Sequence, residues 1–197
     1  MRLLGTLLVL ALLGFGVAVR AQDRTPPSRN PALLEATFGK LPLYFIENRG
    51  VFPADVAYYL QGSDKTLFFT KDGITFRLRG GDRDWVVKLE FLGANPDAMP
   101  RGADRQQAVF SYFKGPEKDW KTGLKTFSKV IYRDLWPGID LVYQAGLGAL
   151  KYEFQVAPGA DPAQIQLRYR GASSVTTSET GALRVATPAG SFEDAPP

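Results

Sequence analysis

The sequence contains no cysteine and no histidine among its 197 residues. Together these absences exclude disulfides, serine–histidine and cysteine–histidine nucleophiles, and zinc sites built from thiolates or imidazoles. Histidine-based pH switching is excluded as well. Aspartate and glutamate remain as the only candidates for acid–base groups or metal ligands. The chemistry left open is carboxylate catalysis or a Ca²⁺ site with oxygen ligands.

The composition is typical of a protein built from strands. It is 45% hydrophobic and 12% aromatic, with 20 glycines and 14 prolines. Short alternating apolar runs bounded by Gly and Pro are typical of β-strands and turns. We therefore expect an all-β protein, an antiparallel β-sandwich of two associated lobes with one short N-terminal helix. A chain of this length can bury one core of ordinary size or two small ones.

The N-terminus has the composition of a secretory signal peptide. Arg2 precedes an apolar run over 3–19, and Val19-Arg20-Ala21 fits a cleavage signal before Gln22, which predicts cleavage of residues 1–21. The alternative is an uncleaved membrane anchor, because the run is just long enough to span a bilayer. Export of a chain without cysteine fits a bacterial route. Cleavage would leave a chain without stable membrane insertion, located in the bacterial periplasm, on the cell surface or outside the cell.

The net charge of +4 does not indicate a nucleic-acid partner. Cleavage of the signal peptide removes two arginines and no acid. The remaining cations are scattered over the polar faces of predicted strands, as at Arg77, Arg79, Arg168 and Arg170. This pattern is typical of a solvated sheet face. We expect neither nucleic acid nor a cofactor.

Residues 22–40 are expected to form a flexible leader followed by the short helix. The first part is polar and rich in proline, which favours a flexible segment. Asn30 can cap a helix over 31–38, and Gly39 can end it.

Residues 41–197 are expected to form the β-rich domain. A stretch rich in Pro, Gly and polar residues over 93–107 divides it into candidate lobes at 41–94 and 108–197. The last eight residues, 190–197, have the composition of a linker rather than of a packed terminus.

Two hairpins stand out in this domain. Alternating runs at 139–144 and 149–156 flank a Gly-Leu-Gly turn and carry large apolar groups on one face, so we expect this hairpin at the centre of a sheet. The other hairpin is predicted about Asp72 and Gly73, because Asp-Gly accepts the positive φ that a tight turn requires.

Five ordered motifs lie in this domain. They are FIENRG at 45–50, FTKDG at 69–73, FLGANP at 91–96, YRDLWPGIDL at 132–141 and VAPGADP at 156–162. The series resembles the domain of unknown function at the N-terminus of bacterial exported proteins that carry SBBP-type β-propeller repeats. This resemblance implies an extracytoplasmic β-rich module, the head of a propeller-repeat protein or a truncated form of one. It implies no catalytic residues.

The residues of these motifs are expected to hold strand register at turns. They are Glu47, Asn48, Arg49, Gly50, Asp72, Gly73, Trp136, Pro137, Gly138, Asp140, Pro158, Gly159 and Asp161. The alternative is a Ca²⁺ site made from loop carboxylates, including that of Asp134. The turn role is favoured, because Asp and Asn side chains bond their own turns and no repeated Asp spacing is present.

Two further hypotheses concern sugars. A glycosidase needs two carboxylates a few ångströms apart across a cleft, and Glu47, Asp140 and Glu153 are the candidates. Glu153 lies on a polar strand face, so we expect it to be exposed rather than in a cleft. We therefore expect no enzymatic activity. Trp120 and Trp136 fall in predicted loops and could stack on pyranose rings. The expected function is a non-enzymatic exported structural or interaction module of the bacterial envelope, contacting a cell-surface protein or glycan. A carbohydrate-binding module is the alternative.

Overall fold

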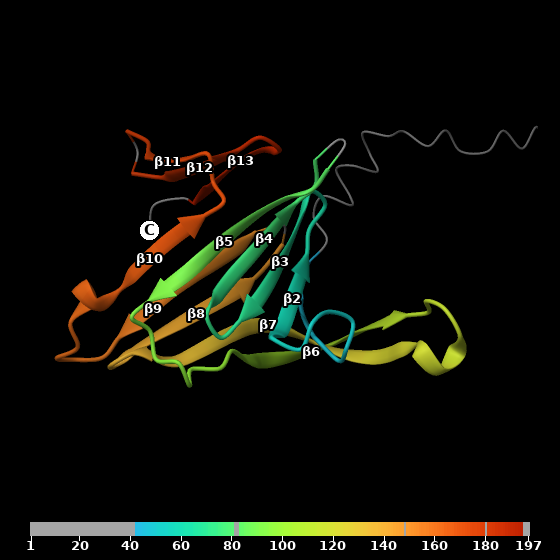
Figure 1. Ribbon diagram of the computed structural model, residues 1–197. Helices are drawn as coiled ribbons and strands as arrows, with labels where there is room; N and C mark the ends of the chain where they lie inside the picture. Colours follow the sequence, from blue (N-terminus) through green and yellow to red (C-terminus); the bar gives the residue numbers. More distant parts are fainter. Residues whose placement is uncertain (1–41, 81–82, 148, 180, 195–197) are drawn as a thin grey trace, which may run out of the picture.

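The computed structural model describes residues 42–80, 83–147, 149–179 and 181–194. Antiparallel strands dominate this part of the chain (Figure 1), as the sequence predicts. The strands are β1 (Phe45–Glu47), β2 (Val56–Gln61), β3 (Lys65–Thr70), β4 (Gly73–Leu78), β5 (Trp85–Leu92), β6 (Arg101–Tyr112), β7 (Lys121–Trp136), β8 (Ile139–Ala145), β9 (Leu150–Val156), β10 (Gln166–Arg170), β11 (Ser174–Thr177), β12 (Leu183–Thr187) and β13 (Gly190–Asp194). Two 3₁₀ turns, η1 (Glu117–Asp119) and η2 (Pro162–Gln164), complete the elements.

Ten strands form one sheet, which turns at β7. The order is β10-β5-β4-β3-β2-β1-β7-β8-β9, with β6 also paired to β7. Phe127 of β7 pairs with β1 on one edge and with β6 on the other, whereas Lys129 pairs with β8 and β6. Strands β1 and β8 therefore follow one another along the same edge of β7. The sheet curls into a half-barrel, with β3 to β5 in front of β8 and β9 (Figure 1).

The hydrophobic core fills the inside of this curl. Both layers contribute large buried side chains, among them Phe45, Phe69, Ile74, Leu89, Phe91, Tyr132, Trp136, Leu141 and Tyr143. A side chain of this size contributes about 1.5–3 kcal/mol when fully buried. A hydrogen bond also joins the layers, because the Tyr132 hydroxyl donates to the Thr70 carbonyl oxygen at 2.9 Å.

The expected hairpin over 139–156 is present, but its position in the sheet differs from the prediction. Strand β8 is buried as expected, whereas β9 is the last strand in the sheet order and, among the described strands, pairs only with β8. Tyr152 and Val156 are consequently 37% and 42% exposed. Alternation showed that one face of β9 is apolar, but the missing neighbour on its outer edge could not be read from local pattern.

The two candidate lobes share one core and one sheet. Phe91, from the first, contacts the rings of Tyr132 and Trp136, from the second, at centroid distances of 5.3 and 6.1 Å. The segment over 93–107 was expected to connect the lobes, but strand β6 begins within it, at Arg101. Its polar residues form a strand because β7 supplies a long pairing partner, with register shifts after Arg105.

A three-stranded sheet, β11-β12-β13, packs across one end of the half-barrel. Val185 of β12 is buried against Leu78 and Val87, and the ring of Phe192 in β13 stacks on Phe76 at 4.9 Å. Strands β11 and β12 pair in antiparallel register. The linker prediction for 190–197 was wrong over Gly190–Asp194, because pairing with β12 makes this segment a packed strand.

The expected signal peptide, flexible leader and N-terminal helix lie outside the described residues. Within the described ranges, no helix is long and apolar enough to cross a membrane.

Candidate functional site

The β6–β7 hairpin projects from the sheet as an arm (Figure 1). Tyr112 and Lys121 are the last paired residues, and the pairs Phe110–Leu124 and Val109–Lys125 lie nearer its base. In its outer half, β6 and β7 pair only with each other among the described strands, whereas Phe127 at its base also pairs with β1. The arm is thus a two-stranded extension of the sheet.

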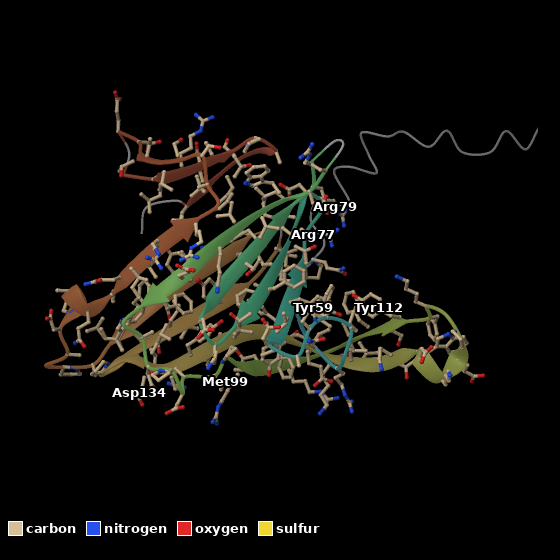
Figure 2. The ribbon with its side chains drawn as sticks, in the orientation of Figure 1. Tyr59, Arg77, Arg79, Met99, Tyr112 and Asp134 are labelled. Atoms are coloured by element: carbon tan, nitrogen blue, oxygen red, sulfur yellow. The ribbon has the colours of Figure 1, made fainter. Side chains whose placement is uncertain are left out.

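Side-chain contacts on the outer face of the sheet fix the direction of the arm. Leu124 is buried beside Ile46 and Tyr59. The Tyr59 hydroxyl donates to the Tyr112 hydroxyl at 3.0 Å, which in turn donates to the Gln61 side-chain oxygen at 3.2 Å. Burial and the hydrogen bond with Tyr112 raise the pKa of Tyr59 well above its ordinary value. These contacts hold the base of the arm against the sheet, and Figure 2 labels Tyr59 and Tyr112.

Two aromatic rings lie at the tip of the arm. Phe113 follows β6 and is 65% exposed, while Trp120 follows η1 and is 38% exposed. The rings meet edge to face with centroids 5.0 Å apart, and the Trp120 indole N–H donates to the Gly115 carbonyl oxygen at 3.1 Å. The tip therefore presents an ordered aromatic surface to solvent. Such a surface can stack on a sugar ring or enter an apolar pocket of a protein.

Trp136, the other predicted glycan contact, lies in the core rather than in a loop. It is the last residue of β7 and only 1% exposed. Its ring packs against Phe91 and Phe154, and its indole N–H donates to the Leu92 carbonyl oxygen at 3.0 Å. The prediction placed it in a loop because Pro137 follows directly. In the fold the side chain points inward, and its ring is not available to a ligand.

The turn after Trp136 is held by Asp140. This carboxylate accepts the backbone N–H of Asp134 at 2.8 Å and pairs with the Arg133 guanidinium. Asp134 has a φ of +46°, so β7 bends here and the register shifts before Trp136. Gly138 closes the turn with a φ of +72°.

A shallow depression of about 420 Å³ adjoins this turn. It is lined by Arg133, Asp134, Gly138, Asp140, Gln155, Val156 and Ala157. Its principal charged groups, the Asp140 carboxylate and the Arg133 guanidinium, already bond each other.

Asn48 organises the loop between β1 and β2. Its side-chain oxygen accepts the backbone N–H groups of Val51 and Phe52, each at 3.0 Å. Its amide nitrogen donates to the carbonyl oxygens of Phe52, Pro53 and Val56 at 3.1, 2.9 and 2.8 Å. One side chain thus replaces the backbone partners that a loop of this shape lacks.

The other loop motifs also make local contacts. The Asp161 carboxylate accepts the Ala163 N–H at 2.9 Å and caps η2. Gly159, just before it, has a φ of +86°. At the β3–β4 hairpin, the Asp72 carbonyl oxygen accepts the Phe91 N–H at 3.2 Å. A Cβ on Gly73 would lie 2.0 Å from a backbone oxygen of β5.

The carboxylates proposed for sugar hydrolysis are each engaged. Glu47 accepts the Lys125 N–H at 2.9 Å and lies 3.9 Å from the Arg49 guanidinium, and Glu153 accepts the Gln155 amide N–H at 2.7 Å. Asp140 and Glu153 come from the neighbouring strands β8 and β9, while Glu47 lies on β1. In the described part of the chain, no three acidic side chains group in a way that could hold a metal ion.

Sequence reasoning missed a second depression, of about 130 Å³, on the outer face of β2 to β4. Phe52, Gln61, Thr66, Phe68, Arg77 and Arg79 line it. The alternation of Arg77 and Arg79 with core residues indicated the outward face, but Phe52 arrives from the Asn48 loop, which local pattern does not place.

The fold and these surfaces define a class: an antiparallel curled-sheet domain with a projecting, aromatic-tipped hairpin. Residues 45–197 match the family described as Domain of unknown function (DUF7948), and the chain belongs to this family. No curated protein and no solved structure matches the chain.

Proposed function

We propose that the protein is a non-enzymatic interaction module exported to the bacterial cell envelope, of the type that forms the N-terminal head of propeller-repeat proteins. The apolar N-terminal run over 3–19 and the cleavage signal Val19-Arg20-Ala21 before Gln22 support export. The motif carboxylates support a non-enzymatic role, because Glu47, Asp140 and Asp161 are each bonded within the fold.

The observation that carries this proposal is the exposed pair of Phe113 and Trp120 at the tip of the arm. Large aromatic side chains contribute strongly to binding when a partner covers them. The Tyr59–Tyr112 contact and buried Leu124 fix the arm. The tip is therefore preorganised for a cell-surface partner.

Carbohydrate binding is the second candidate function. The Trp120 indole N–H is already bonded to Gly115, so its remaining exposed surface is largely apolar. Apolar ring faces are what the CH faces of pyranose rings stack against. Lys114 and Lys118, both exposed beside the tip, can bond sugar hydroxyls.

Co-sedimentation with purified cell-wall sacculi of the source bacterium tests the proposed function. The double substitution Phe113→Ala and Trp120→Ala should weaken binding at least about tenfold, since covered interface aromatics contribute more than about 1.4 kcal/mol. The control Leu147→Ala removes an exposed apolar side chain from another part of the surface and should leave binding unchanged.

Pretreatment of the sacculi separates the two candidate partners. Loss of binding after protease digestion identifies a protein partner, whereas competition by soluble cell-wall glycan identifies a sugar. Equal binding by the parent and the tip variant, with unchanged melting temperatures, would contradict the proposed role of the arm.

A further inference from the structure

The outer face of β4, β5 and β10 is cationic. Arg77, Arg79, Lys88, Arg168 and Arg170 belong to these strands or directly follow them, at positions that alternate with core residues. Figure 2 shows Arg77 and Arg79 together along β4, with Tyr59 and Tyr112 below them. Two carboxylates oppose these five cations within the face: Asp84 bonds Arg77 at 2.5 Å, and Glu90 bonds Arg168 and Arg170 at 2.6 and 3.4 Å. At the rim, Asp64 pairs with Lys65. The face keeps an excess of positive charge.

The depression of about 130 Å³ lies at one side of this face. Arg77 donates to Asp84 through Nε and Nη2, and Arg79 donates to the Ser63 carbonyl oxygen through Nη1 at 3.3 Å. A guanidinium has five N–H donors, so each arginine has further donors for a ligand. Gln61 and Thr66 add an amide and a hydroxyl to the lining.

Aromatic rings form the rest of the lining. The rings of Phe68 and Phe52 meet edge to face with centroids 4.9 Å apart. Both are partly buried against the cluster of Ile46, Tyr59 and Leu124. Their positions are thus fixed. Guanidinium donors, neutral polar groups and a rigid aromatic surface together fit a sugar that carries a carboxylate: the arginines bind the anion, the polar groups bind hydroxyls, and a ring stacks on the sugar.

The depression is too small to enclose a whole sugar ligand. Sites that enclose a small ligand usually measure about 300–1,000 Å³, so this depression can hold one charged group and part of a ring. The cations continue beyond it across neighbouring strands, because Arg77 is paired in register with Val86, and Lys88 with Arg170. Repeated weak contacts along a chain give affinity that one such contact cannot.

We propose that this surface binds an acidic polysaccharide, with one carboxylate held by Arg77 and Arg79 and the following residues of the polymer lying over Lys88 and Arg170. The proposal is independent of the arm tip, which lies elsewhere on the protein. Polysaccharide is favoured over nucleic acid because the carboxylates of Asp84 and Glu90 offset part of the positive charge of the face. Affinity for a phosphate backbone increases with the number of phosphates that the protein neutralises, and the small excess of cations here can neutralise only a few.

Calorimetry with oligogalacturonate as the probe tests the proposal on the full chain. The parent should bind, the fully methyl-esterified oligomer should not, and Arg77→Gln with Arg79→Gln should weaken binding by at least about tenfold, as expected for the loss of charge-assisted hydrogen bonds. The matched control Arg105→Gln with Lys151→Gln removes two exposed cations outside this face and should change affinity less than about threefold.

The substitution Asp84→Asn keeps the test decisive if the double variant does not fold. It frees Arg77 from its carboxylate, and affinity should rise about two- to fivefold, the range of an exposed ion pair. Three results would overturn the proposal: no binding of the acidic oligomer, equal binding of its methyl ester, or single-stranded DNA of equal charge binding as tightly and with the same dependence on Arg77 and Arg79.

Discussion

Asn48 is the residue whose replacement tests most directly how the motifs support the fold. The substitution Asn48→Asp keeps the side-chain oxygen that accepts from Val51 and Phe52 but removes the NH₂ group that donates to three carbonyl oxygens. The two N–H donors, which the three carbonyl oxygens share, are lost. A negative charge is placed against the carbonyl oxygens of Phe52, Pro53 and Val56.

The magnitude follows from these contacts. A hydrogen bond contributes about 1 kcal/mol net, so the loss of two, with added repulsion, should lower the free energy of unfolding by about 2–3 kcal/mol. For a domain of this size the melting temperature should fall by about 5–10 °C. Urea denaturation followed by tryptophan fluorescence measures the change, since Trp136 is buried in the core.

Asn95→Asp is the matched control. The Asn95 side-chain oxygen accepts the Asp97 N–H at 3.0 Å, which an aspartate can also accept, whereas its NH₂ group donates one long hydrogen bond, to the Asp134 carbonyl oxygen at 3.3 Å. The loss of that bond should cost less than about 1 kcal/mol. If the free energies of unfolding of the two variants differ by less than about 0.5 kcal/mol, the assigned role of Asn48 is wrong.

Two other substitutions test the packing and the charges of the sheet. Gly73→Ala should lower the free energy of unfolding by about 2–4 kcal/mol, because φ is +150° and the new Cβ would lie 2.0 Å from a backbone oxygen. Gly93→Ala, with a φ of +64° and open space around its Cβ, should cost only about 1–2 kcal/mol; equal losses in thermal melts would contradict the packing. The Arg168 hydrogen bond holds the pKa of Glu90 below its usual value of 4.5. The ionised carboxylate therefore stabilises the fold fully at pH values above 4.5. This contribution is lost as the pH falls through the lowered pKa of the folded protein. The melting temperature of Glu90→Gln should therefore lie below that of the parent at pH 7 and converge with it as the pH is lowered; a constant gap would show that Glu90 acts without its charge.

The strands that could be predicted are those whose alternation is strong. Ile74, Phe76 and Leu78 alternate with polar residues in the sequence. Ile74 and Leu78 are buried, and Phe76 packs against both adjoining clusters. The Asp72-Gly73 hairpin was found where Asp-Gly predicts it. Alternation reports directly which face meets the core, so it predicts this part of the fold.

The parts that sequence did not predict depend on contacts between distant segments. Strand β6 carries few apolar residues in its first half and forms because β7 pairs with it. Trp136 is buried because Phe91 and Phe154, far away in the chain, pack around it. A Pro-Gly turn beside it suggested a loop, and no local signal shows those partners.

The candidate surfaces were predicted only in part. Trp120 was expected in a loop, and it lies at the tip of the arm. Phe113 was missed, although the Gly115-Pro116 pair that follows it indicates a turn. Arg77 and Arg79 were interpreted as a solvated face. The depression between them and Phe52 exists because a distant loop folds over the sheet.

The central claim is that the protein acts by contact outside the cytoplasm. It is tested most directly by fractionating the source cells and sequencing the N-terminal peptide of the native protein by mass spectrometry. The account predicts a peptide that begins at Gln22, recovered from the extracytoplasmic fraction. A peptide that begins at Met1, recovered from the cytoplasmic fraction, would contradict the account.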